Sequence, residues 1–193
     1  MATAEQGQEV RRRLLAAAAE LIPERGWTAV STRVLAQRAG VTPSVVHYHF
    51  PSVAALLNEA VIAVMQGTVA ELDGLLGQVR TPADAVDALC ASLDRYRGDD
   101  ALSLLFFEGY LAGTRDPELR ERIAGVLDGF GRTFGDWLGT HGVAAPQEVA
   151  AVLMAAIDGL VLRRGLGGDL DVTVTATVLR RLLSASRDEG DVR

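Results

Sequence analysis

The sequence predicts an all-α protein of nine helices, divided into a small N-terminal domain (1–51) and a larger C-terminal domain (52–193). Three observations predict this fold class. Apolar residues recur every three to four positions along most of the chain, no segment alternates apolar and polar residues long enough to form a sheet, and proline or glycine separates the periodic segments. Hydrophobic residues make up 49% of the chain, which is ample for a buried core and excludes general disorder.

The N-terminal domain contains the first three predicted helices. The first has an apolar face that begins near Leu14, and it ends before Gly26, because glycine readily adopts the conformation that follows many helices. A short second helix over 32–39 stops at Gly40, and a proline at its first position opens the third, over 43–50.

Six further helices are predicted in the C-terminal domain, each opened by a capping residue or a proline. Their expected ranges are about 52–76, 82–96, 100–112, 117–139, 146–165 and 171–187. The last two carry long apolar stripes, and Ala155, Ala156 and Gly159 permit close approach of another helix. We expect these two helices to pair across a two-fold axis and form a homodimer; the alternative is that they only complete the core of a single chain.

Charge is distributed unevenly along the chain. The net charge is −6, but residues 1–53 carry +2 and the remainder carries −8. A basic N-terminal segment followed by an acidic remainder is typical of a protein that contacts phosphates at one end. Because the chain has no lysine, the groups that bind phosphates must be arginines or helix N-termini. The single cysteine, Cys90, excludes an internal disulfide and fits a reducing cytoplasm. No stretch has the roughly 20 uncharged apolar residues of a membrane span, so we expect no membrane partner.

A pair of short helices joined by a tight turn is the most informative feature of the N-terminal domain. Residues 32–39 and 43–50 have the spacing of a helix-turn-helix, in which the second helix enters a major groove, although helix hairpins also occur in ordinary α-helical cores. The string TRVLAQRAGVT at 32–42, followed by HYHF at 47–50, resembles the DNA-binding segment of the TetR family of transcriptional regulators, and the likeness extends over 17–57. It implies a TetR-like fold, with a three-helix DNA-binding domain and a C-terminal domain that binds a ligand and dimerises.

The predicted DNA contacts lie in these two helices and at the start of the fourth. A cation in the first turn of a helix, such as Arg33, is poorly placed relative to the helix dipole, so an external anion is an attractive partner. Tyr48 is a surface contact rather than a core residue in this interpretation, since Val46 and Phe50 fill the neighbouring core positions. The predicted DNA-contacting residues are Thr32, Arg33, Thr42, Pro43, Ser44, Val45, His47, Tyr48, His49 and Ser52.

Two positions depart from the pattern of the family. The family usually has tyrosine where this chain has His47, and lysine where it has Val53, and both family residues bind phosphates. His47 can still donate a hydrogen bond, whereas Val53 cannot, so we expect lower non-specific affinity for DNA. Val53 also keeps a second interpretation open, a helical small-molecule-binding protein that has lost DNA binding.

The C-terminal domain holds most of the aromatic residues. By resemblance, it encloses an apolar cavity for a small-molecule effector; the alternative is that these side chains are simply core. The predicted effector-binding residues are Met65, Cys90, Phe106, Tyr110, Phe134 and Trp137. The resemblance therefore implies a regulator, and specifically a repressor that a small apolar effector releases from a palindromic DNA operator.

The sequence gives little support to an enzyme. His47 and His49 face opposite sides of a helix and cannot share a metal ion, and the third histidine, His141, is far away in sequence. The chain has no Gly-rich phosphate loop and no nucleophile elbow. We therefore expect no catalysis, no cofactor and no metal; a helix-bundle enzyme, the third interpretation, would require one of the last two.

Overall fold

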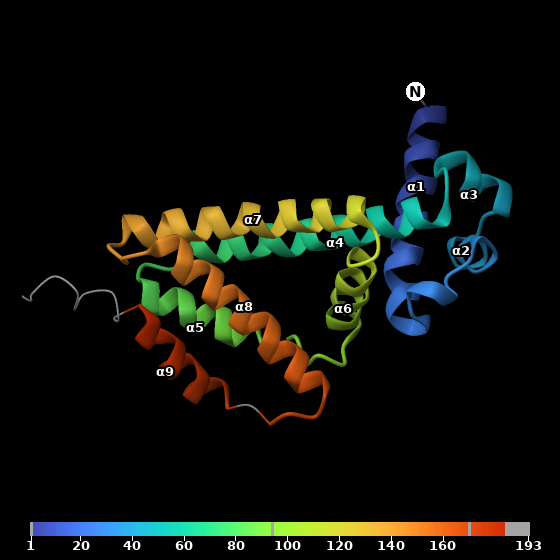
Figure 1. Ribbon diagram of the computed structural model, residues 1–193. Coiled ribbons are helices and arrows are strands. Elements are labelled where there is room, and N and C mark those ends of the chain that lie inside the picture. Colours follow the sequence, from blue (N-terminus) through green and yellow to red (C-terminus); the bar gives the residue numbers. More distant parts are fainter. Residues whose placement is uncertain (1, 94, 170, 184–193) are drawn as a thin grey trace, which may run out of the picture. The chain divides into compact units, whose positions relative to one another are not determined.

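The computed structural model describes residues 2–93, 95–169 and 171–183, and all regular structure in this part of the chain is helical (Figure 1). The predicted all-α class is confirmed, with nine α-helices among the described residues and one short 3₁₀ helix, η1. The elements are α1 (Ala2–Arg25), η1 (Trp27–Ala29), α2 (Thr32–Ala39), α3 (Pro43–His49), α4 (Val53–Leu76), α5 (Pro82–Ser92), α6 (Ala101–Gly113), α7 (Pro117–Thr140), α8 (Pro146–Gly165) and α9 (Val172–Leu182).

Two predicted helix ends and one predicted loop differ from the structure. α5 ends at Ser92 instead of Tyr96; beyond it, the carbonyl of Leu93 accepts hydrogen bonds from the N–H of Tyr96 (3.2 Å) and from the Arg164 guanidinium. α9 ends at Leu182, and the rest of its predicted range, beyond 183, lies outside the described residues. The loop expected between α1 and α2 contains η1.

The chain packs as two compact units, the first comprising Met1–Gly67 and Leu104–Ile123, the second Thr68–Ser103 and Ala124–Arg193. α4, α6 and α7 each contribute residues to both units. Packing therefore divides the chain differently from the division by function proposed between residues 51 and 52.

In the first unit, α1 packs on α2 and α2 packs on α3. Large apolar side chains of α1, α2 and the start of α4 have essentially no solvent access and form its core. The largest of them are Leu14, Leu21, Ile22, Leu35, Leu56 and Leu57. This packing follows the predicted stripes and fixes which faces of α2 and α3 remain exposed.

In the second unit, α5 packs on α9, and Figure 1 shows the two helices beside each other. The core is one cluster to which α4, α5, α7, α8 and α9 all contribute. Its largest members are Leu76, Leu89, Phe130, Phe134, Leu138, Leu153 and Leu179. The aromatic residues of α7 in this cluster face inward, as their spacing predicts.

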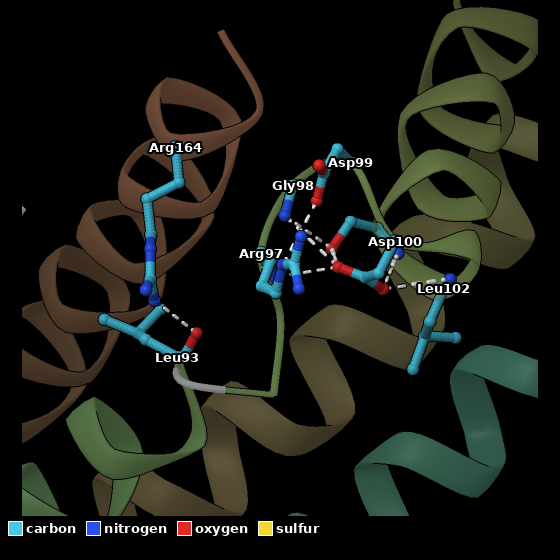
Figure 2. A network of polar contacts seen from close by, with 8 residues as sticks. Leu93, Arg97, Gly98, Asp99, Asp100, Leu102 and Arg164 are labelled. Carbon is cyan, nitrogen blue, oxygen red and sulfur yellow. Dashed lines mark hydrogen bonds and ion pairs between the residues drawn. The ribbon is translucent and has the colours of Figure 1, made fainter. Parts of the chain in front are cut away.

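The loop between α5 and α6 is held by one carboxylate (Figure 2). Asp100 Oδ2 accepts hydrogen bonds from the backbone N–H groups of Arg97 (2.7 Å) and Gly98 (3.1 Å) and from the Ser103 hydroxyl (2.6 Å). Its Oδ1 accepts from the N–H groups of Leu102 (3.1 Å) and Ser103 (3.0 Å), and so caps α6. Burial alone would raise the pKa of this carboxyl, but the hydrogen bonds from Ser103, Arg97 and Gly98 outweigh burial and lower the pKa.

Of the described helices, α4 alone is long and apolar enough to cross a membrane, judged by length and composition only. This criterion allows charged residues, whereas the expectation concerned roughly 20 uncharged ones; α4 contains Glu59, Glu71 and Asp73. Leu56 and Val61 on the same helix are buried within the protein.

Candidate nucleic-acid interface

α2 and α3 form a helix-turn-helix at the predicted position. α2 is closed by the N–H of Gly40, which donates to the carbonyl of Gln37 (3.3 Å), and by the N–H of Val41, which donates to the carbonyl of Ala36 (2.9 Å). Thr42 then precedes α3, with a proline at its first position as expected.

The orientation of α3 follows from the burial of its side chains. Val46 and Phe50 are 1% and 3% exposed and turn one face of the segment into the core of the first unit. Tyr48 is 84% exposed, so it lies outside the core, and its ring meets that of His49 edge-on, with 5.1 Å between centroids. The ring and hydroxyl of Tyr48 are therefore accessible to a binding partner.

All ten predicted DNA-contacting residues belong to the first unit, and most are accessible. The exposed ones are Arg33, Thr42, Pro43, Ser44, His47, Tyr48 and Ser52, and the half-buried ones are Thr32, Val45 and His49. Ser52 accepts a hydrogen bond from the N–H of Ala55 (3.0 Å) and so caps α4. The half-buried Val53 that follows offers no donor where the family usually has lysine.

Four of the six arginines of the first 53 residues bind other groups of the protein at or near its surface, which the sequence did not reveal. The ion pairs are Arg11–Glu59 (2.5 Å), Arg12–Glu9 (2.6 Å), Arg38–Glu20 (2.9 Å) and Arg38–Glu24 (2.5 Å), and Arg13 donates to the carbonyls of Ala39 and Gly40. The hydrogen bond from Arg38 is the main cause that lowers the pKa of Glu24. Arg33, in contrast, is exposed and makes no hydrogen bond or ion pair with any described residue, so its charge is available to an external anion.

The six predicted effector-binding residues divide between the two units. Met65, Phe106 and Tyr110 belong to the first unit, and Cys90, Phe134 and Trp137 to the second. Met65, Cys90 and Phe134 are buried, and the other three are half-buried. Burial raises the pKa of the Cys90 thiol, which makes it a poor nucleophile or metal ligand. Because the six belong to two separately packed units, the shared effector site remains a prediction.

A cavity of about 330 Å³ opens in the second unit, at residues that the sequence analysis did not single out. It is lined by Thr81, Pro82, Ala83, His141, Gly142, Val143, Arg180 and Leu183. None of the six predicted effector-binding residues lines it, and Arg180 is paired with Asp87 at 3.1 Å. Within the described part of the chain, no group of three or more His, Cys, Asp or Glu side chains could hold a metal ion.

The outer sides of α8 and α9 carry large apolar side chains that a single chain leaves exposed. We refer to Val152, Leu162, Leu166, Val174 and Val178, which are 46–80% exposed, as the terminal-helix face. Asp158 also lies on α8. Although this carboxyl keeps access to solvent, the surrounding protein desolvates it in part and raises its pKa to about 6.

Comparisons with known proteins match both parts of the chain. The family model described as bacterial regulatory proteins, tetR family, matches residues 14–60, and the one described as tetracyclin repressor-like, C-terminal domain, matches residues 80–185. The HTH-type transcriptional regulator BetI of Brucella anthropi is 26% identical over 181 residues, which cover 88% of each chain. A transcriptional regulator of Streptomyces coelicolor A3(2) is 31% identical in its solved structure, with a TM-score of 0.75, covering 91% of this chain and 99% of its own. The multidrug binding protein EbrR, solved with imidazole, is 27% identical, with a TM-score of 0.69, covering 89% of this chain and 88% of its own.

The helical fold, the exposed helix-turn-helix and these matches define a DNA-binding transcriptional regulator. The second family model spans more than half of the chain. The chain therefore belongs to the TetR family of transcriptional regulators, and the resemblance carried by residues 32–50 is confirmed.

Proposed function

We propose that the protein is a ligand-responsive repressor that binds a palindromic operator as a homodimer and is released by a small apolar effector. The observation that carries DNA binding is the exposed side of α3, where Tyr48 lies opposite the buried Val46 and Phe50. In this proposal α3 enters the major groove and the first turn of α2 meets the DNA backbone. Such a protein acts in the cytoplasm, where the chromosome lies.

Each predicted contact has a role that suits its chemistry. Arg33 pairs with a phosphate or with a guanine, since a guanidinium fits both in a bidentate manner. Val45 offers apolar contact to a thymine methyl group, and Ser44 and Tyr48 present hydroxyls to bases or phosphates. His47 and His49 donate hydrogen bonds to the backbone. These assignments agree with the accessibility of the side chains.

Homodimerisation is supported by the terminal-helix face. Five large apolar side chains on α8, α9 and the residue after α8 contact water in a single chain, whereas a second copy would cover them in an isologous four-helix contact. A dimer of this kind presents two copies of α3 to successive major grooves, about 34–36 Å apart.

Release by an effector follows from linkage. A ligand that prefers an arrangement of the dimer unsuited to the operator weakens DNA binding by a coupling of about 1–3 kcal/mol. EbrR, whose solved structure contains imidazole, supports a small-molecule effector for this chain as well. Met65 of α4 is among the proposed effector contacts, and α4, which has residues in both units, then connects sensing with DNA binding.

The experiment that tests the function is a titration of labelled DNA from the region upstream of the protein's own gene. Arg33→Ala is expected to cost about 1–3 kcal/mol of operator affinity in fluorescence anisotropy and to leave the fold intact. Arg132→Ala, which removes the same charge from an exposed position in the second unit, is the matched control and should bind like the wild type. Unchanged affinity of Arg33→Ala would refute the role of that residue.

A second outcome concerns the function as a whole. If the wild-type protein shows no salt-dependent binding to any fragment, the alternative of a small-molecule-binding protein without DNA binding is favoured. The half-buried Val53, in place of a phosphate-binding lysine, is the observation that keeps this alternative.

A further inference from the structure

α6 contains a single charged residue, Glu108, in an otherwise apolar helix of sequence ALSLLFFEGYLAG. A carboxylate in such surroundings is costly unless it has a hydrogen-bonding partner. Glu108 is half-buried, and its Oε2 accepts a hydrogen bond from the backbone N–H of Trp27, at 2.9 Å. Both residues belong to the first unit, so a helix of the C-terminal domain contacts the segment between α1 and α2 directly.

This hydrogen bond supplies a cap that the local sequence lacks. Trp27 is the first residue of η1, and the residue before it, Gly26, has no side chain that could accept from the N–H groups of η1. Gly26 has φ 80° and ψ 153°, a conformation that is almost restricted to glycine, so a capping Ser or Asp is excluded at that position. The carboxylate of Glu108, 81 residues away in sequence, supplies the hydrogen-bond acceptor that a capping side chain at position 26 would otherwise provide.

The capped segment leads directly into α2. Only residues 28–31 separate Trp27 from the first residue of α2, and Val30 among them is buried. The N-cap of α2, Ser31, makes no side-chain hydrogen bond of its own. The start of α2, which carries Arg33, therefore depends on tertiary contacts for its position.

α6 and the start of α7 are themselves fixed within the first unit. A Cβ placed on Gly109 would lie 2.8 Å from Val61 Cγ1, so α6 approaches α4 closely beside Glu108. The buried Asn58 of α4 donates a hydrogen bond to Asp116 Oδ2 (2.9 Å), which is the main cause that lowers the pKa of Asp116. Glu108 thus acts from a rigid support.

We propose that Glu108 is a positioning residue for DNA recognition, whose carboxylate holds the start of α2 where Arg33 reaches the DNA. The inference rests on the proposed DNA binding. It makes α6 a connection between the C-terminal domain and the DNA-binding helices that is separate from α4.

The test is a set of operator titrations with Glu108→Ala, Glu108→Gln and the control Glu121→Ala. Loss of a cap predicts that Glu108→Ala weakens operator binding by about three- to thirty-fold, whereas Glu108→Gln, whose amide oxygen can still accept, stays within about three-fold of the wild type. Glu121→Ala removes the same charge from an exposed position on α7 of the first unit and should not weaken binding. In an Arg33→Ala background, Glu108→Ala should have almost no further effect, because the two act through one contact.

Hydrogen exchange separates this inference from the proposed function. Glu108→Ala should accelerate amide exchange over residues 27–33 in the free protein, whether or not the wild type binds DNA. Unchanged exchange, unchanged operator affinity, or a full additional loss in the Arg33→Ala background would each overturn the inference. If Glu108→Ala does not fold, Glu108→Asp takes its place: it keeps the charge, shortens the side chain by one methylene and should show the same two effects.

Discussion

The α5–α6 loop lies against the backbone at the end of α8, and this close approach predicts a large effect of one methyl group. A Cβ placed on Gly98 would lie 2.3 Å from both the backbone N of Gly165 and the carbonyl oxygen of Val161. Backbone atoms cannot rotate away as side chains do, so Gly98→Ala must displace the loop from α8. Figure 2 shows the two contacts that such a shift would disturb, the Arg164 hydrogen bond to Leu93 and the loop around Asp100.

The size of the effect has two sources. Gly98 has φ 82°, where a residue with a Cβ pays about 1–2 kcal/mol of conformational energy. The forced displacement of packed groups adds about 1–3 kcal/mol. We therefore expect Gly98→Ala to lower the free energy of unfolding by about 2–5 kcal/mol.

Gly142→Ala is the matched control for this prediction. Gly142 has φ 76°, but a Cβ placed on it meets no atom within 4 Å. It should lose only the conformational part, about 1–2 kcal/mol. Urea unfolding of both variants at one protein concentration measures the difference, since assembly makes stability depend on concentration. Equal losses for the two variants would refute the argument that backbone contact with α8 constrains the loop.

Two further predictions concern the α8–α9 region. Val178→Asp, on the terminal-helix face, should convert the dimer to a monomer in analytical ultracentrifugation. The control Leu111→Asp, at an exposed apolar position on α6, should leave the dimer intact. A dimeric Val178→Asp variant would mean that the interface lies elsewhere. The folded-state pKa of Asp158 is raised from 3.8 to about 6, so its stabilising contribution is present below about pH 4 and is lost as the pH rises through about 6. The wild-type Tm should therefore fall relative to that of Asp158→Asn across this window, and parallel Tm curves would contradict the shift.

The parts of the fold that the sequence predicted are those set by local chemistry. Proline at the first position of α3, α5 and α8 and glycine after α2 mark helix ends through the conformations that these residues allow. The end of α5 and the existence of η1 were not predicted, and at both places a distant residue makes a hydrogen bond that sequence spacing does not reveal. Arg164 donates a hydrogen bond to the carbonyl of Leu93, 71 residues away in sequence. Glu108 accepts one from the N–H of Trp27, 81 residues away.

The same distinction applies to the candidate interface. The spacing of buried positions was enough to predict that Tyr48 faces outward, since Val46 and Phe50 occupy the core. Formal charge, however, did not reveal which arginines are available, because Arg11 pairs with Glu59 on another helix. One signal for a missed residue was present in the sequence: Glu108 is the only charge in an apolar helix, which indicates a specific polar partner.

The engagement of the arginines has a consequence for how the protein binds DNA. The chain has no lysine, four of the six arginines of residues 1–53 bind other groups of the protein, and Val53 stands at the usual lysine position; within the helix-turn-helix, Arg33 is therefore the cation best placed to neutralise a phosphate. Each neutralised phosphate contributes about −0.9 to the slope of log affinity against log salt, so the slope is expected to be shallow and non-specific binding weak. Affinity for the operator must then come mainly from neutral donors and base contacts, which require accurate positions. If α2 were displaced, the interface would lose the ionic contact of Arg33, which is one of few. The hydrogen bond from the Trp27 N–H to Glu108 holds the segment before α2 and so keeps Arg33 in position.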